Sequence, residues 1–359
     1  MIHPRRTLQV LAVAVLACAT ALTAVPAASA APTTPADGQV RAEEPYIPPT
    51  VKYLWAGSET FDYSLDDGAT TKTGYYQSVD PPPVWLNPYD LDSGRDVKNS
   101  VTTEGDVTTV SQTYRASGEG ARFKLPVGQD YRASTGWSVL ATRTGRGGPL
   151  SVWRPGSLLP VQNAIGGNVV SGIPSSAVIS RVLTGGSVRH AAVVYQYQGV
   201  FTAGLVDLAT YTFRPYATDF QWSTGIRFND KWFATDEGPD HTLRAVPVDS
   251  PGTAPTELGD GGALRLRAVV GDQLVLGDPE PDSGEAPSVA TVSATDRTRR
   301  TVFDTAQSSV AVTQDGSALV GARDADGQWW VYHLVPAYPD GFAARAAWSL
   351  MPQESRRGS

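Results

Sequence analysis

Cysteine is almost missing from this chain, and histidine is scarce. The 359 residues include a single cysteine, Cys18, and 4 histidines. Cys18 lies in an N-terminal stretch that we expect to be removed, so the mature chain can form no disulfide, even outside the cell. Stability must then come from burial of a hydrophobic core, for which the chain is long enough.

Familiar catalytic and metal-binding motifs are missing too. The sequence has no Gly-x-Ser-x-Gly elbow, no His-Glu-x-x-His, no phosphate-binding loop and no metal-spaced Cys/His set. Beyond the N-terminal stretch, His190, His241 and His333 fall at different positions along their strands. We interpret them as separate structural residues; the alternative is a cluster of ligands or bases in a central channel. We therefore predict no catalytic residue and no firm cofactor.

Basic residues are fewer than acidic residues in this chain. The formal net charge is −7, and removal of Arg5 and Arg6 with a cleaved leader makes it more negative. Such a charge argues against nucleic acid as a partner. No second long apolar segment follows the leader, so we expect no membrane span. We also expect the protein to be a monomer.

Residues 1–30 have the organisation of a secretory signal peptide. Two arginines precede an apolar stretch, residues 8–25, and Ala28-Ser29-Ala30 supplies a small-residue cleavage site. The chain is therefore predicted to be secreted. An uncleaved membrane anchor is the alternative, although the apolar stretch is short for a span. A second alternative is lipidation at Cys18, which lies within the weak lipobox Val15-Leu16-Ala17-Cys18.

The remaining chain divides into three parts. Residues 31–50 are rich in Pro, Thr and acids and predict a disordered linker. Residues 51–350 are expected to form the folded domain, and residues 351–359 a polar tail. One segment, residues 314–334, reads QDGSALVGARDADGQWWVYHL. Its two apolar runs around an Asp/Gly-rich tip predict a buried β-hairpin.

The hairpin pattern occurs seven times in all, at steps of roughly 30 to 55 residues and most often about 42, the length of one four-stranded propeller blade. Apolar runs such as Ala191-Ala192-Val193-Val194-Tyr195 favour strands packed on both faces over a single sandwich. We predict an all-β fold, a β-propeller of seven four-stranded blades, with six or eight as alternatives. Helical patterns are missing apart from a possible turn at residues 342–350. The expected hairpins pair residues 74–79 with 84–89, 107–113 with 121–125, 137–143 with 150–154, 191–196 with 201–208, 230–235 with 242–247, 272–277 with 288–292, and 318–322 with 329–334.

Three segments resemble blades of secreted propellers from high-GC Gram-positive bacteria. They are GLVDLATYTFRPY (residues 204–216), VVGDQLVLG (residues 269–277) and the segment from 314 to 334. In that group the propeller often precedes FG-GAP-type repeats with calcium-binding loops. The resemblance implies a propeller over about residues 50–350; it does not extend to those calcium sites.

Hairpin tips of neighbouring blades lie side by side, so their charges predict a surface. An acidic arc is expected on the last three blades, with a basic spot at Arg143 and Arg146 across the ring. The arc could bind calcium or a basic partner; the alternative is that these are simply the solvated tips of an acidic protein. Asp90-x-Asp92 and Asp324-x-Asp326 resemble fragments of calcium-binding loops, and ordinary hairpin turns are the alternative there. Its members are Asp236, Glu237, Asp240, Asp278, Glu280, Asp282, Glu285, Asp324 and Asp326.

Two classes of function fit these observations. The first is a secreted, non-catalytic propeller that binds an extracellular protein, a glycan or an ion through loops on one face. The second is a carbohydrate-active propeller enzyme, a hydrolase or lyase, with carboxylates at the channel mouth. We favour binding, because the fold alone implies no activity. We also expect Val51–Trp55 to complete the last blade and so close the ring.

Overall fold

The computed structural model describes most of the chain beyond residue 50. Described are residues 51–349, except 57–59, 66–71, 76–88, 90, 92–93, 96, 115–116, 144, 146–147, 157–161, 220–224, 278–287, 305–309, 315, 324–328 and 337–342. At 51–75, 162–165, 323, 329 and 343–349 only the backbone is described. Residues 1–46 and 47–359 are separate units, and every described strand belongs to the second.

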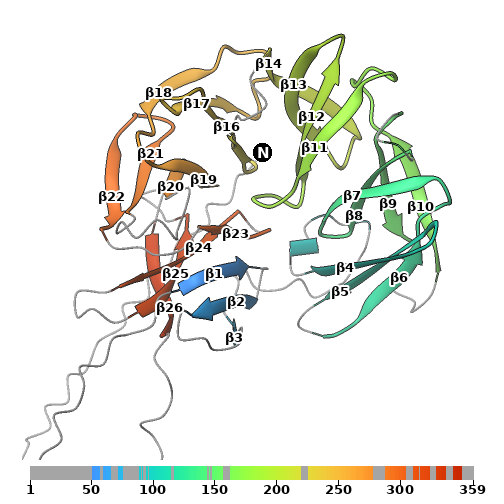
Figure 1. Cartoon of the computed structure of the whole chain (residues 1–359), viewed down its shortest axis with the longest axis horizontal. Coiled ribbons are helices and arrows are strands. Elements are labelled where there is room, and N and C mark those ends of the chain that lie inside the picture. Colours follow the sequence, from blue (N-terminus) through green and yellow to red (C-terminus); the bar gives the residue numbers. More distant parts are fainter. Residues whose placement is uncertain are drawn as a thin grey trace, which may run out of the picture. The chain divides into compact units, whose positions relative to one another are not determined.

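The described residues form antiparallel sheets and no α-helix (Figure 1). Six sheets are hydrogen-bonded, one of which has seven strands. That large sheet consists of two antiparallel units joined only where Gln162 and Asn163 pair in parallel with Phe123 and Lys124. There are thus seven antiparallel units, as predicted. The first two have three described strands each instead of the expected four.

The strands run through the sheets in chain order. The first unit contains β1 (Val51–Ala56), β2 (Thr60–Leu65) and β3 (Lys72–Tyr75), and the second β4 (Val97–Glu104), β5 (Val107–Tyr114) and β6 (Gly120–Lys124). The third contains β7 (Gln129–Thr135), β8 (Ser138–Arg143), β9 (Ser151–Pro155) and β10 (Gln162–Val169), and the fourth β11 (Val178–Leu183), β12 (His190–Tyr197), β13 (Val200–Asp207) and β14 (Thr212–Thr218). The fifth contains β15 (Gly225–Phe228), β16 (Trp232–Glu237), β17 (Thr242–Pro247) and β18 (Thr256–Asp260), and the sixth β19 (Arg265–Val270), β20 (Gln273–Gly277), β21 (Val289–Ser293) and β22 (Arg299–Phe303). The last contains β23 (Ala311–Val312), β24 (Ala318–Arg323), β25 (Trp329–Val335) and β26 (Ala343–Ser349).

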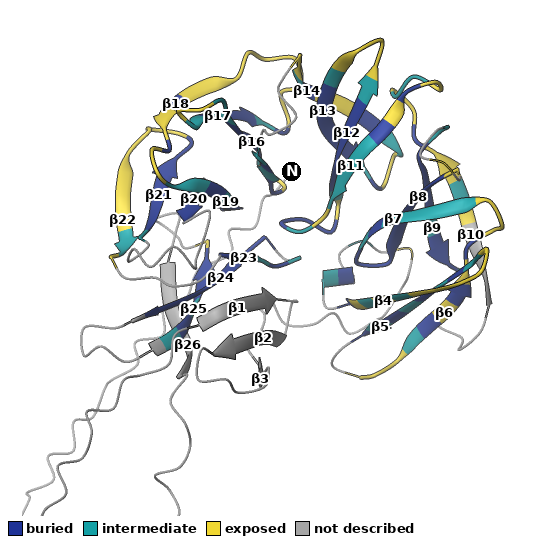
Figure 2. Cartoon of the chain, viewed as in Figure 1, coloured by how far each residue is buried: buried dark blue, intermediate teal, exposed yellow. Residues whose placement is uncertain are grey.

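The hydrophobic core lies between successive sheets, as in a propeller. Leu140 and Leu150 of the third unit pack with Ile179 and Phe213 of the fourth. The fourth packs on the fifth, the fifth on the sixth, and the sixth on the last through similar clusters. Strands in the middle of a sheet are therefore buried on both faces, as in β21, whereas outer strands such as β18 and β22 are exposed (Figure 2). Together with the sheet order, this packing shows that the chain forms a β-propeller.

Six of the seven predicted hairpins are confirmed. They correspond to β5–β6, β8–β9, β12–β13, β16–β17, β20–β21 and β24–β25. The first stays a prediction: Gly74 lies in β3 and pairs with Phe61 of β2, which does not exclude a second partner strand on the other side of β3. Its remaining residues, except Tyr75 and Tyr89, lie outside the described part of the chain.

Two expectations are corrected. The helical turn predicted at residues 342–350 is instead strand β26, which pairs with β25. Val51–Trp55 does lie against the last sheet, since β1 contacts β23 and β24. However, β1 pairs with β2, and the last sheet takes all four strands from its own part of the chain.

The last sheet instead reaches earlier sheets through the turn before β24. Gln314 accepts a hydrogen bond from Gly136 N–H at 3.0 Å and donates one to the Val97 carbonyl at 3.3 Å. The neighbouring Thr313 carbonyl accepts from Gly186 N–H at 2.7 Å. These contacts join the last sheet to the second, third and fourth units.

Candidate functional site

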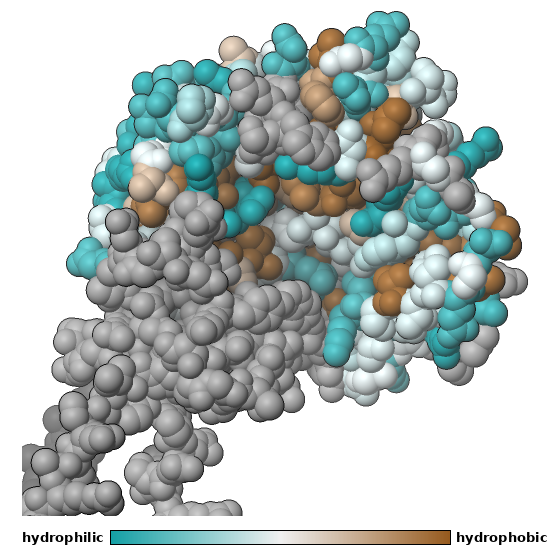
Figure 3. All heavy atoms as spheres, in the orientation of Figure 1, coloured by the Kyte–Doolittle hydropathy of each residue, from teal (hydrophilic) through white to brown (hydrophobic). Residues whose placement is uncertain are grey.

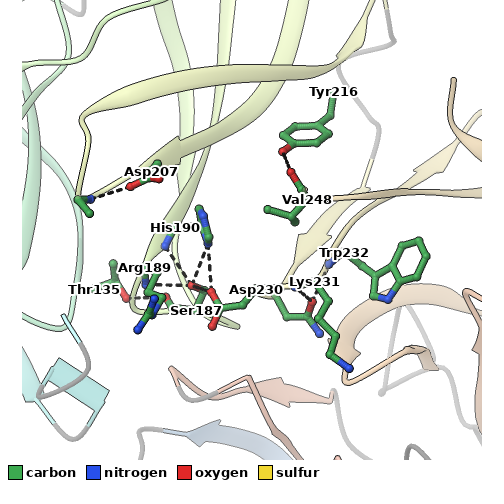
Figure 4. A network of polar contacts seen from close by, with 12 residues as sticks. Thr135, Ser187, Arg189, His190, Asp207, Tyr216, Asp230, Lys231, Trp232 and Val248 are labelled. Carbon is green, nitrogen blue, oxygen red and sulfur yellow. Dashed lines mark hydrogen bonds and ion pairs between the residues drawn. The ribbon is translucent and has the colours of Figure 1, made fainter. Parts of the chain in front are cut away.

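Ser187, His190 and Asp230 form a polar cluster between the fourth and fifth sheets (Figure 4). Ser187 lies in the connection from β11 to β12, His190 begins β12, and Asp230 lies in the turn before β16. Ser187 Oγ is 2.5 Å from Asp230 Oδ1, and His190 Nδ1 is 3.1 Å from the same oxygen. Serine, histidine and aspartate are the residue types of a hydrolase triad.

The geometry of this cluster does not suit nucleophilic catalysis. In a catalytic triad the histidine lies between the serine and the carboxylate and takes the serine proton. Here Ser187 donates directly to Asp230 and accepts the N–H groups of Arg189 and His190 at 2.9 and 3.0 Å. Ser187 is also buried. The cluster therefore connects two sheets and caps a turn.

The cluster sets the charge state of Asp230. Burial acts to raise the pKa of this carboxyl, but the hydrogen bonds from His190 and Ser187, with the charges of His190 and Arg189, lower the pKa below its ordinary value. A lowered folded-state pKa means that the ionised carboxylate stabilises the fold. This contribution is complete above the unfolded-state pKa and is lost as the pH falls through the folded-state pKa.

Asp230→Asn should therefore destabilise the protein at neutral pH and not in acid. Because the Asp230 side chain is half exposed, at 49%, we expect a fall in the thermal midpoint of only a few degrees. The midpoints of the two proteins should converge as the pH falls below the ordinary carboxyl pKa of 3.8. Thermal unfolding from pH 3 to pH 7 measures this, and a constant difference across the range would contradict it.

A second histidine–carboxylate pair involves Asp236, which the sequence predicts at an exposed tip. The structure buries Asp236 instead. Its Oδ1 is 2.9 Å from His241 Nδ1, and its Oδ2 accepts the Leu266 N–H of the next sheet at 3.0 Å. The reason is its place on β16, where alternate side chains point into the gap between sheets.

The other members of the predicted acidic arc have different positions. Glu237 is paired with Arg244 and accepts a hydrogen bond from Thr235 Oγ1 at 2.8 Å, while Asp240 is exposed. The remaining six carboxylates, and Arg146 of the basic spot, lie outside the described residues: Asp278, Glu280, Asp282, Glu285, Asp324 and Asp326. A continuous arc thus stays a prediction.

Calcium binding also stays a prediction. Within the described ranges, no group of three or more His, Cys, Asp or Glu side chains could hold a metal ion. Asp90 and Asp92 lie outside those ranges. The third histidine, His333, is buried and its Nε2 is 2.6 Å from Ser317 Oγ. The three histidines thus have different partners, as the structural interpretation predicts.

Four arginines on the first strands of successive sheets were not predicted from the sequence as candidate site residues. Arg132, Arg181, Arg227 and Arg267 lie on β7, β11, β15 and β19. Arg227 Nε donates to the Arg267 carbonyl at 2.6 Å, and Arg227 Nη1 to the Ile226 carbonyl at 2.7 Å. Burial, together with the charges of Arg267 and Arg181, lowers the pKa of Arg227 to about 10. An arginine five to nine residues before the first strand of each of these four hairpins was the available signal.

No helix in the part of the chain that is described has the length and apolar character needed to cross a membrane.

Comparisons with known proteins give matches of fold only. No protein-family model matches the chain, and no curated protein matches it. Among solved structures, the chain is similar to an oligogalacturonate lyase in complex with manganese, at 12% identity and a TM-score of 0.40 over 66% of this chain and 81% of that one. It is similar to a prolyl endopeptidase, at 12% identity and a TM-score of 0.44, over 80% of this chain but only 47% of that one. It is also similar to the β-propeller domain of the Trilobed protease from Pyrococcus furiosus, at 8% identity and a TM-score of 0.41, over 83% of each chain. At these values the likenesses carry no argument about activity.

Proposed function

We propose that this chain is a secreted, non-catalytic β-propeller that binds an extracellular protein or glycan through hairpin tips of its third and fourth sheets. The observation that supports this is the placement of exposed hydrophobic side chains. Six large hydrophobic residues are exposed among the described side chains, and five of them belong to these two sheets or the turn before them. The five are Val127, Val169, Val178, Tyr197 and Val200.

The strand registers place these residues at one end of each sheet. Tyr197 pairs with Val200 across the β12–β13 tip, and Val178 is opposite Gln196 beside it. In the third sheet, Val169 pairs with Ser151, and Val127 comes two residues before Gln129, which pairs with Arg143 at the same end. Figure 3 shows hydrophobic atoms at several points of the surface over β7–β14.

Grouped exposed apolar side chains are a feature of recognition surfaces. The tip residues Tyr197 and Val200 are 36% and 42% exposed. Tyrosine in particular combines a large apolar area with a polar group, which is common at binding sites. By contrast, the one Ser/His/Asp cluster in the described residues connects sheets and has no free nucleophile. These two findings together favour binding over catalysis.

The test is retention on immobilised probes by the mature chain, with the double variant Tyr197→Ser/Val200→Ser for comparison. A panel of cell-wall fractions, plant glycans and extracellular proteins should retain the unchanged chain on at least one probe. The double variant should lose about tenfold or more in affinity, because central contacts of this kind dominate binding. Each probe is also analysed for cleavage.

Tyr89→Ser is the matched control, because Tyr89 is 55% exposed and its hydroxyl donates to the Gly156 carbonyl, at the end of β9 opposite the hairpin tip. It should bind like the unchanged chain. Cleavage of any probe would show an enzyme and overturn the proposal. Equal retention of the double variant and the unchanged chain would place the binding surface elsewhere and refute it as stated.

A further inference from the structure

The second unit of the propeller is fully buried on one face only. Its described strands are β4, β5 and β6, and β5 lies between the other two. Half-buried and buried residues alternate along the whole of β5. Middle strands of later sheets, such as β12 and β21, are instead buried through most of their length (Figure 2). One face of the second unit therefore lacks the close packing that covers both faces of those sheets.

The buried face of the second unit packs against the third. Val110 of β5 and Phe123 of β6 share a hydrophobic cluster with Val139 of β8. Polar groups on this face are paired, since Gln112 Nε2 donates to Asn99 Oδ1 at 2.8 Å. Successive side chains of a strand point to opposite faces, so the residues between these lie on the other, less buried face.

That other face carries polar side chains in register across all three strands. Ser100 of β4 pairs with Ser111 of β5, which pairs with Arg122 of β6. A row of the same kind lies on either side of this one. Neighbouring strands are about 4.8 Å apart and successive rows roughly 7 Å apart, so the groups form a regular grid. The rows, which we call the polar face, are Lys98-Thr113-Gly120, Ser100-Ser111-Arg122 and Thr102-Thr109-Lys124.

The side chains of the polar face have no partner elsewhere in the described part of the chain. None of them makes a hydrogen bond or an ion pair there, in contrast to Gln112 and Asn99 on the opposite face. The five on the outer strands β4 and β6 are exposed, and the three on β5 are half-buried. Their hydroxyl, ammonium and guanidinium groups are therefore available to a ligand.

The charge on the polar face is of one sign. Lys98, Arg122 and Lys124 belong to it, and none of its members is a carboxylate. Glu104 and Glu119 lie just outside the rows, at the end of β4 and before the start of β6. This local excess of positive charge occurs in a chain whose net charge is −7. The face therefore attracts an anionic partner.

We propose that the polar face binds an acidic glycan. The sugar hydroxyls pair with the serine and threonine side chains, which both donate and accept hydrogen bonds, and carboxylate or sulfate groups pair with the three cations. No member of the face has an apolar side chain. An acidic polypeptide fits less well, because the centre of a protein interface is usually apolar. The face belongs to a different unit from the hairpin tips, so the proposal does not depend on the function proposed above.

The experiment measures binding of the mature chain to four immobilised polymers. Polygalacturonate carries carboxylates, dextran sulfate carries sulfates, dextran is neutral, and polyglutamate is an acidic polypeptide. At 0.05 M sodium chloride we expect one of the two acidic glycans to bind about tenfold or more tightly than dextran, because charge-assisted hydrogen bonds form only with the acidic chain. The affinity should fall severalfold at 0.2 M sodium chloride, because salt screens exposed charges. The two arms distinguish a carboxylate ligand from a sulfate ligand.

The variant Lys98→Gln/Arg122→Gln/Lys124→Gln tests the assignment of the cations. Its affinity for the acidic glycan should be about tenfold weaker, and its dependence on salt should be smaller. The matched control removes the same charge from exposed residues of other sheets, and should bind like the unchanged chain: Arg214→Gln/Arg297→Gln/Arg300→Gln.

The variant Thr102→Val/Thr109→Val tests the hydroxyl groups. It keeps the shape of both side chains and removes two hydrogen-bonding groups, so the affinity should fall about threefold with the salt dependence unchanged. Equal binding of the acidic glycans and dextran would overturn the proposal, as would an equal loss in the two triple variants. Polyglutamate bound as tightly as the glycans would show that the face does not select a glycan, and would overturn the assignment of the ligand.

Discussion

Phe233→Ala should lower the free energy of unfolding by about 3–5 kcal/mol, among the largest effects of any single substitution in this chain. Phe233 is 1% exposed and lies in the cluster that joins the fourth and fifth sheets. Its ring stacks on Tyr216, with 5.1 Å between centroids and 20° between planes. Truncation to alanine removes this stacking and leaves a cavity between two sheets. Urea unfolding monitored by circular dichroism measures the change.

Phe233→Leu is the control for this prediction. It keeps most of the buried volume and should cost less than half as much as the alanine variant. If both variants lost the same stability, the shape of the ring, and not the cavity, would be the cause. A loss below about 1 kcal/mol for Phe233→Ala would contradict the packing described here.

Gly186→Ala should destabilise the protein by about 2–4 kcal/mol, because both backbone strain and close contact act at this position. Gly186 has a φ of 85°. A Cβ added there would lie 2.1 Å from the Phe228 carbonyl oxygen, which cannot move without shifting β15. Its N–H also donates to Thr313 of the last sheet. The free energy of unfolding, again from urea titration, tests the prediction.

Gly199→Ala separates the two causes. Gly199 has nearly the same φ, 84°, but an added Cβ would meet nothing within 4 Å. The free energy of unfolding of Gly199→Ala should therefore fall only by the part due to backbone strain, about 1 kcal/mol. If Gly199→Ala were as destabilising as Gly186→Ala, the close approach of Gly186 to Phe228 would have no energetic role.

The sequence predicts the fold well where each pair of strands is local. In β12 and β13, apolar runs flank a two-residue tip, Gln198-Gly199, and both residues have the positive φ that such a tip needs. Local pattern and tertiary packing agree there. They disagree in β26, where residues 343–349 read AARAAWS. Alanine favours a helix in isolation, but pairing with β25 overrides that preference.

The candidate sites were less predictable, because they depend on contacts between sheets. Asp236 and Asp240 look alike in the sequence, yet one is buried against Leu266 and the other is exposed. The sequence records the alternation along a strand but not which neighbouring backbone lies across the gap. Nor does the sequence show that Arg227 donates a hydrogen bond to the Arg267 carbonyl, which is 40 residues away. Contacts of this range follow from the arrangement of blades, which spacing alone does not determine.

The contacts of Gln314 have a consequence for how the molecule is made. They join residues 178 and 217 positions apart, and each must wait until the turn before β24 exists. During synthesis the earlier sheets can each pair their own strands, since all of those pairings are local. The hydrogen bonds from this turn to the second and third units form only once the last part of the chain has been made, and closing so long a loop has an entropic cost. Until then, the faces that flank the opening are exposed to solvent, and a partly made chain is more open to proteases and to aggregation than the finished one.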